Sequence, residues 1–222
     1  MMSFLEDLKD KRLKKKGQKL LTKNDFEKAY LLFQKAILLN NSVENKFNLA
    51  LSLLSLSEYS KAEKYLKNIY DEYPENELNL LALAECNIMQ KKWDEAIKFY
   101  RLTVKLFPDK KSFKNYLKIS EDVVAREKYV KAKELFKKAT IELKQKKDKN
   151  ALNILIQANE YFPEDATIIN NIATLYIMLK DFHKAYSYSM KAVSLRPDDP
   201  RFQNNLKIAK RKLKKTVNTF LK

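Results

Sequence analysis

The chain has 222 residues, a formal net charge of +17 and a single glycine. Strand hairpins and phosphate-binding loops lean on glycine for backbone conformations with positive φ, so the composition argues against both. One cysteine excludes an intramolecular disulfide and a zinc site built from several cysteines. Alanine, leucine, lysine and glutamate, which favour helices, dominate long stretches, and we therefore expect an all-α protein.

No stretch of the sequence resembles a targeting segment or a membrane span. The first residues mix acids with lysines where a secretion signal needs an uninterrupted apolar core. No run approaches the roughly 18 apolar residues of a transmembrane helix. We expect a soluble, cytoplasmic chain, a location that the single cysteine also favours.

The first predicted helices lie in residues 10–42, with an extension toward the N-terminus. Ser3 and Glu6 have the spacing of a capping box, in which each side chain bonds the backbone amide of the other residue. A helix should therefore begin there. A second helix should carry Phe26 and Ala29 on one face.

Residues 43–76 and 77–110 repeat one pattern with a period of 34 residues. An aromatic residue is followed by alanine after three positions, by a large residue after four more and by proline after a further eight. The two sets are Tyr59, Ala62, Leu66 and Pro74, and Trp93, Ala96, Tyr100 and Pro108. Each range is expected to form two antiparallel helices that end at the proline, because proline cannot continue a helix.

Residues 111–165 interrupt the period, since Pro108 and Pro163 are 55 residues apart. Ala139 fits two overlapping versions of the pattern, so the segment holds material for three helices. No glycine or proline separates the first two helices, which leaves their fusion open. The expected helices are 111–126, 127–146 and 148–162.

The pattern returns in residues 166–199, with Phe182, Ala185 and Pro197 in the repeat positions. A basic helix follows in residues 200–222. Its apolar side chains share one face, which holds Phe202, Leu206, Ala209 and Leu213 and continues to Val217 and Phe220. Because the end of a stack of repeats exposes its core, we expect this face to cap the last hairpin.

A small residue precedes the aromatic residue in all four regular segments: Gly17, Ala50, Ala84 and Ala173. Small residues let two helices approach closely, and acids after the prolines, such as Asp109 and Asp165, can cap the helices that follow. This combination resembles the tetratricopeptide repeat family. The resemblance implies an α-solenoid, in which antiparallel helix hairpins stack into a right-handed superhelix, and a non-enzymatic scaffold or adaptor for another protein.

In this family the first helix of each hairpin lines the concave side, so the resemblance implies a groove for a partner peptide or helix. The open alternative is that the same side chains pack against neighbouring repeats. In the last repeat the corresponding stripe is polar, with Asn170 and Thr174. The candidate groove residues are Lys14, Gln18, Phe47, Asn48, Leu51, Leu54, Leu81, Glu85, Ile88, Leu117, Glu121 and Val124.

Some members of the family hold the C-terminal carboxylate of a chaperone with lysines, asparagines and an arginine. Lys14 and Asn48 match two of those positions. Gln18 stands where another asparagine is expected, and Leu78 and Ala82 stand where two cations belong. The sequence therefore does not predict chaperone binding.

The basic ends of the chain suggest a second function. Residues 1–42 carry a net charge of +5 and residues 200–222 carry +8. Such segments can contact RNA or an anionic membrane surface, but lysine is also the ordinary residue for the solvated face of a cap. Both interpretations stay open for the candidate contact residues Lys207, Lys210, Arg211, Lys214 and Lys215.

Nothing in the sequence indicates catalysis. His183 is the only histidine, and paired acids such as Asp198 and Asp199 are typical of helix caps. Trp93 occupies the aromatic position of its repeat, and Cys86 lies in an apolar stretch, where a thiol packs as a small apolar side chain. We expect no catalytic residue, cofactor or metal ion.

Overall fold

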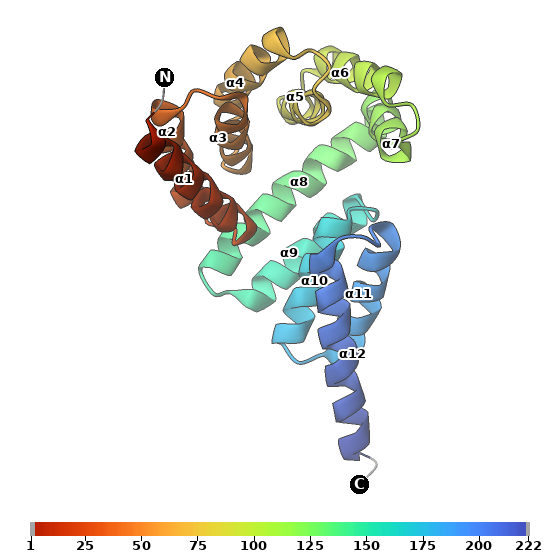
Figure 1. Cartoon of the computed structure of the whole chain (residues 1–222). Helices are drawn as coiled ribbons and strands as arrows, with labels where there is room; N and C mark the ends of the chain where they lie inside the picture. The colour runs from red at the N-terminus through yellow and green to blue at the C-terminus, as the bar shows by residue number, and fades with distance from the viewer. Residues whose placement is uncertain (1–2, 221–222) are drawn as a thin grey trace. The chain divides into compact units, whose positions relative to one another are not determined.

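The computed structural model describes residues 3–220, with side chains for residues 3–216, and every regular element in this part of the chain is an α-helix (Figure 1). The all-α class predicted from the sequence is confirmed. The residues form two compact units, Met1–Arg126 and Glu127–Lys222. None of the described helices is both long and apolar enough to cross a membrane.

The first unit consists of consecutive helices that pack against their neighbours in the chain. Within this unit α3 and α5 lie on the inner side of an arc, and α4 and α6 lie on its outer side (Figure 1). The helices are α1 (Phe4–Thr22), α2 (Phe26–Leu39), α3 (Val43–Ser55), α4 (Tyr59–Glu72), α5 (Glu77–Met89), α6 (Trp93–Leu106) and α7 (Lys111–Glu121).

The turn inside each hairpin has the same backbone geometry. One residue adopts a positive φ of 58–64°, and the amide of the next residue donates to the carbonyl five residues earlier, as in Lys92 N to Asn87 O at 2.9 Å. This arrangement is a Schellman motif, which usually contains glycine. Here other residues take the left-handed conformation: Asn24, Ser57, Lys91, Lys146 and Lys180.

Small residues lie where helices cross, as the sequence predicted. Ala50, Ala84 and Ala173 are fully buried. Gly17 on α1 faces Phe33 on α2 so closely that a Cβ atom on Gly17 would lie 2.6 Å from the ring carbon Cζ. No side chain larger than hydrogen fits there unless Phe33 moves.

The irregular segment forms three helices, but the expected boundary at residue 126 is wrong. α7 ends at Glu121, and α8 (Val123–Lys144) begins two residues later. Asp122 between them is extended, and its Oδ1 accepts a hydrogen bond from Ala125 N at 2.8 Å. The extended backbone of Asp122 ends α7. Its side chain caps the start of α8, so neither glycine nor proline is needed between the two helices.

The second unit contains the rest of α8 together with α9 (Asp148–Tyr161), α10 (Ala166–Met178), α11 (Phe182–Leu195) and α12 (Pro200–Phe220). Ala139 packs in one buried cluster with Ala151, Leu155 and Ala158 of α9. Of the two sequence frames that Ala139 fitted, the packing therefore follows the one that ends at Pro163.

Asp165 caps α10 as the sequence predicted. Its Oδ1 accepts hydrogen bonds from Thr167 N at 2.8 Å and Ile168 N at 3.1 Å, and its Oδ2 lies 2.9 Å from Lys133 Nζ. The equivalent prediction for Asp109 is wrong, because α7 starts after Lys110 and has no side-chain cap.

The apolar face of α12 covers the last hairpin, as predicted for a capping helix. Ala209 is buried in one cluster with Tyr176 and Ala185. Phe202 is buried in another cluster with Ala166, Ile169 and Ala192. Val217 and Phe220, which were expected to continue this face, lie outside the described side chains.

Candidate functional site

An apolar stripe follows the first helices of the hairpins in the first unit. Phe47, Leu51 and Leu54 recur on α3 at spacings of four and three residues, and all three side chains are half-buried. Leu81 on α5 and Leu117 on α7 are also half-buried. These side chains keep exposed apolar surface, and their role as a groove stays a prediction.

Two of the predicted groove residues are buried instead. Ile88 is 1% exposed and Asn48 is 6% exposed. Both lie on helices that pack against the preceding and following helices, α5 between α4 and α6 and α3 between α2 and α4. Burial therefore extends around each helix beyond the stripe that faces its hairpin partner.

Lys14 is already bound to acids within the first unit. Its Nζ lies 2.6 Å from Glu44 Oε2 on α3 and 3.3 Å from Asp10 Oδ2 on α1. The hydrogen bond from Lys14 to Glu44 is the main cause that raises the pKa of the Lys14 ammonium. Lys14 thus joins two helices, while its neighbour Gln18 is exposed.

The two predicted groove carboxylates have different surroundings. Glu121 is paired with Arg101 on α6, whose Nη2 lies 2.7 Å from Glu121 Oε1. The Tyr100 hydroxyl on α6 has a pKa well above its ordinary value. Burial is the main cause, and the negative charge of Glu85 on α5 raises this pKa further. Val124 is 63% exposed but belongs to the first turn of α8 rather than to α7.

A buried polar cluster joins the first two repeats. Asn45 Nδ2 donates to Asp10 Oδ1 at 2.7 Å and to the backbone oxygen of Asn40 at 2.8 Å. Asp10 is 1% exposed and Asn45 is fully buried. This cluster was not predicted from the sequence, although Asn79 stands 34 residues after Asn45 and similarly donates to Leu66 O at 2.9 Å.

A second ion cluster joins α4 to the turn after α5. Both Lys67 Nζ and Lys92 Nζ lie 2.6 Å from an oxygen of Glu63, and Gln90 Nε2 donates to Glu63 at 2.9 Å. Burial alone would raise the pKa of the Glu63 carboxyl, but these hydrogen bonds outweigh it and lower the pKa to about 2. The cluster is structural, because Lys67, Lys92 and Gln90 all bind Glu63.

In the second unit, α12 covers the polar stripe of α10. Asn205 Nδ2 donates to Asn170 Oδ1 at 2.9 Å and to Thr174 Oγ1 at 2.8 Å. The polar side chains that stand at groove positions in the last repeat therefore match a polar side chain of the capping helix. In the sequence, the signal for this contact was Asn205, a polar residue between Phe202 and Leu206 of the apolar face.

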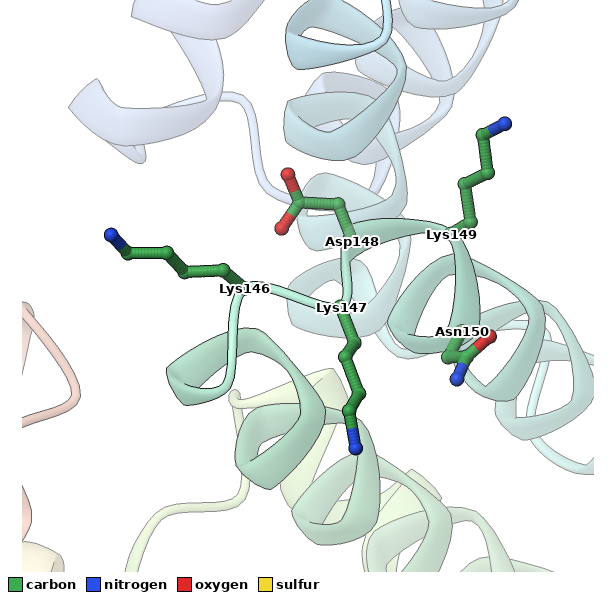
Figure 2. Close-up of a pocket in the computed structure, with 5 residues that line it drawn as sticks. All are labelled: Lys146, Lys147, Asp148, Lys149 and Asn150. Carbon is green, nitrogen blue, oxygen red and sulfur yellow. The ribbon is translucent and has the colours of Figure 1, made fainter.

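The five predicted cations of α12 are all exposed: Lys207, Lys210, Arg211, Lys214 and Lys215. The helix contains no acid. Another basic feature is an open hollow at the turn between α8 and α9, lined by residues 146–150 (Figure 2). Its lysines, Lys146, Lys147 and Lys149, point in different directions, so they do not converge on one anion (Figure 2).

The described residues contain no cluster of histidine, cysteine, aspartate and glutamate suited to a metal ion. His183 is exposed. Cys86 is fully buried, and its thiol donates to Tyr59 O at 3.2 Å. Burial is the main cause that raises the pKa of this thiol to about 12, which keeps it protonated and unreactive near neutral pH.

Comparison with known families finds one matching profile in each unit. The tetratricopeptide repeat profile matches residues 166–199, which cover α10, α11 and the turn between them. A profile described as anaphase-promoting complex, cyclosome, subunit 3 matches residues 18–103. Comparison with curated protein sequences finds no match.

Several solved structures are similar to this chain. The TPR2AB domain of yeast Sti1, solved in a complex with pHSP90, is 18% identical, with a TM-score of 0.46 over 94% of this chain and 86% of that chain. The second TPR domain of human RPAP3, solved with an HSP70 peptide, is 16% identical, with a TM-score of 0.49 over 53% and 98%. A thermophilic TPR protein from Thermus thermophilus, TTC0263, is 16% identical, with a TM-score of 0.46 over 90% and 98%.

Proposed function

The chain is a tetratricopeptide repeat protein, and from this premise we propose that it is a scaffold whose first unit binds a segment of another protein on its inner helices. Tetratricopeptide repeat proteins mediate binding of proteins and peptides, and the partner of this chain is left open. The proposal includes a cytoplasmic location and no catalytic step.

The observation that carries the proposal is the stripe of Phe47, Leu51 and Leu54 on α3, continued by Leu81 on α5. Large apolar side chains that remain half-buried along one line suit the apolar anchors of a helix or an extended peptide. Binding energy in such sites concentrates in a few apolar anchors near the centre. Leu51 and Leu81, on adjacent inner helices, are the central pair.

The test replaces both leucines, as Leu51→Glu with Leu81→Glu. Charges on the binding surface should abolish capture of a partner protein from native lysate. The helical content should stay unchanged, because both side chains are only half-buried. Capture is measured after nuclease treatment and at high salt, which remove contacts through nucleic acid and through surface charge.

The matched control carries the same chemical change on α2, as Leu31→Glu with Leu38→Glu. These two leucines are 53% and 86% exposed and lie away from the inner stripe. A partner that binds the wild type and this control but not the α3–α5 variant supports the proposal. A partner retained by the α3–α5 variant, or a large loss of thermal stability in that variant, would overturn it.

A second function is supported by α12. Its exposed cations Lys207, Lys210, Arg211, Lys214 and Lys215 lie on a helix without acids, and such a face can hold a polyanion such as RNA. In this alternative α12 would have two separate roles, since its apolar face covers the last hairpin.

A further inference from the structure

The outward face of α1 exposes three large apolar side chains within two turns. Phe4 is 75% exposed, Leu5 is 76% exposed and Leu8 is 48% exposed. Single exposed leucines are ordinary on a protein surface. Three neighbours on one helix form a continuous apolar patch, which usually marks a contact.

The same face of α1 continues as a basic strip. Phe4 and Leu8 are followed at spacings of three or four residues by Arg12, Lys15 and Lys19, so these side chains share one side of the helix. Leu5 is followed on an adjacent line by Lys9 after four residues and by Lys16 after seven more. All five cations are exposed: Lys9, Arg12, Lys15, Lys16 and Lys19.

Each of the three acids of α1 is bonded to another group. Glu6 bonds Ser3 in the capping box, with its Oε2 2.8 Å from Ser3 N. Asp7 pairs with Lys11 at 2.6 Å, and Asp10 is buried beside Asn45. Hydrogen bonds with Ser3, and to a smaller extent the charge of Lys9, lower the pKa of the exposed Glu6 carboxyl, so one negative charge borders the strip of five cations.

The opposite face fixes the orientation of α1. Gly17 is in close contact with Phe33 of α2, and Lys14 is paired with Glu44 of α3. The helix cannot turn its exposed leucines inward without breaking these contacts. The capping box also holds the first turn in helical form, so Phe4 and Leu5 are presented by an ordered helix.

We propose that the outward face of α1 docks the protein on an anionic lipid surface. Phe4, Leu5 and Leu8 enter the boundary between headgroups and acyl chains, and the five cations contact the headgroups. Helices that lie in the membrane interface typically combine buried apolar side chains with cations at the headgroups. Each cation near an anionic leaflet adds attraction. The proposal concerns α1 alone and does not depend on the peptide-binding face.

Lipid fits these residues better than RNA does. Cations alone hold the phosphates of RNA, and aromatic rings contribute by stacking on bases. Leu5 and Leu8 have no such role, whereas both contribute to insertion among acyl chains. RNA binding is therefore the alternative that the experiment distinguishes from lipid binding.

The test measures flotation of the full chain with phosphatidylcholine vesicles, with and without about one third phosphatidylserine. The wild type should bind the acidic vesicles only. Phe4→Ser with Leu5→Ser and Leu8→Ser should weaken binding at least about tenfold. Arg12→Gln with Lys15→Gln and Lys16→Gln should weaken it about a hundredfold.

Two controls carry the same kinds of change elsewhere, with two apolar replacements in one and three charge replacements in the other. Leu31→Ser with Leu38→Ser removes exposed leucines from α2, and Lys128→Gln with Lys131→Gln and Lys138→Gln removes three exposed cations from α8. Both controls should bind the acidic vesicles within about twofold of the wild type. Circular dichroism and thermal unfolding should be unchanged in every variant, because all the replaced side chains are on the surface.

The apolar variant decides between lipid and any polyanion. If it floats with acidic vesicles as well as the wild type does, the contact is only electrostatic and the proposal is overturned. The proposal also fails if the charge variant no longer binds a short RNA duplex while the apolar variant binds the vesicles as well as the wild type does.

Insertion is tested separately with a fluorescent dye at Leu5→Cys. The native Cys86 is fully buried, so labelling is selective for the new thiol. An environment-sensitive dye should shift its emission to the blue on acidic vesicles and stay unshifted on neutral ones. An unshifted dye on acidic vesicles to which the protein is bound would show that α1 does not insert, and would overturn the proposal.

Discussion

At the scale of single residues, Gly17 shows how the repeat pattern becomes a steric requirement. A Cβ atom there would lie 2.6 Å from Phe33 Cζ and 2.7 Å from Cε1, both shorter than contacts between carbon atoms allow. The ring is fully buried and cannot swing into solvent. The small residue that the sequence pattern singled out is therefore needed for the α1–α2 crossing.

We predict that Gly17→Ala destabilises the protein by about 1–3 kcal/mol, because overpacking shifts the ring or the helices. The effect should appear although alanine is about 1 kcal/mol better than glycine in a helix. Urea unfolding measures it. Gln18→Ala, on the exposed neighbour, is the control and should be nearly neutral; equal stability of the two variants would contradict a tight crossing.

Glu63 links stability to pH. Its carboxyl has a pKa of about 2 in the folded chain, against an ordinary value of 4.5. Since the folded state lowers the pKa, Glu63 contributes stability above about pH 4.5 and loses it as the pH falls toward 2. The full contribution is about 3–4 kcal/mol, because the pKa falls from 4.5 to about 2 and each pKa unit corresponds to about 1.4 kcal/mol.

We predict that Glu63→Gln is less stable than the wild type at pH 7 and that the difference shrinks between pH 5 and pH 3. The comparison uses urea unfolding of both proteins at each pH, so acids common to both cancel. A difference that stays constant over this range would mean that the pairing with Lys67 and Lys92 does not stabilise the fold.

At the scale of elements, the hairpin turns share a backbone geometry that was not predicted from the sequence. Lys146 and Lys180 are 34 residues apart and both adopt a positive φ. Lysine is not a usual residue for this conformation, so residue type gave no indication. The turn geometry becomes visible only when the carbonyl acceptors of the preceding helix are known.

The helix α12 allows its two proposed roles to be separated. Its apolar face is buried against α10 and α11, while its cations point outward. We predict that replacing Lys207, Lys210, Arg211, Lys214 and Lys215 by glutamine changes the free energy of unfolding by less than about 1 kcal/mol, because exposed charges contribute little. Thermal and urea unfolding check this.

The same variant tests the contact with RNA. If the cations only solvate the cap, RNA affinity should barely change, and this is the outcome we expect. Loss of affinity together with a flatter dependence on salt would show that these five residues release counterions on binding, and would favour the second function.

At the scale of the whole molecule, the chain divides inside the segment where the repeat period breaks. The boundary lies at Arg126, four residues into α8, and Arg126 itself lies over Trp93 at 4.5 Å from the ring centroid. The sequence located the irregularity through the 55-residue interval. It did not locate the start of α8, because Asp122 resembles any other surface acid.

The candidate site was only partly predictable. Helical spacing placed Phe47, Leu51 and Leu81 on one face, and all three keep exposed surface. Ile88 followed the same spacing and is buried. The difference arises because spacing gives the direction of a side chain from its own helix, while burial depends on the helices on either side.

By itself the sequence determined the class of element, the repeat and the capping helix, because each follows from local properties: helix propensity, proline breaks and small residues at regular spacing. Only the tertiary structure decided which polar groups meet. Asn205 bonds Asn170 and Thr174 across 35 and 31 residues, and Asn45 bonds Asp10 across 35. Such pairs depend on how one helix is positioned against another, and residues far apart in the chain determine that position jointly.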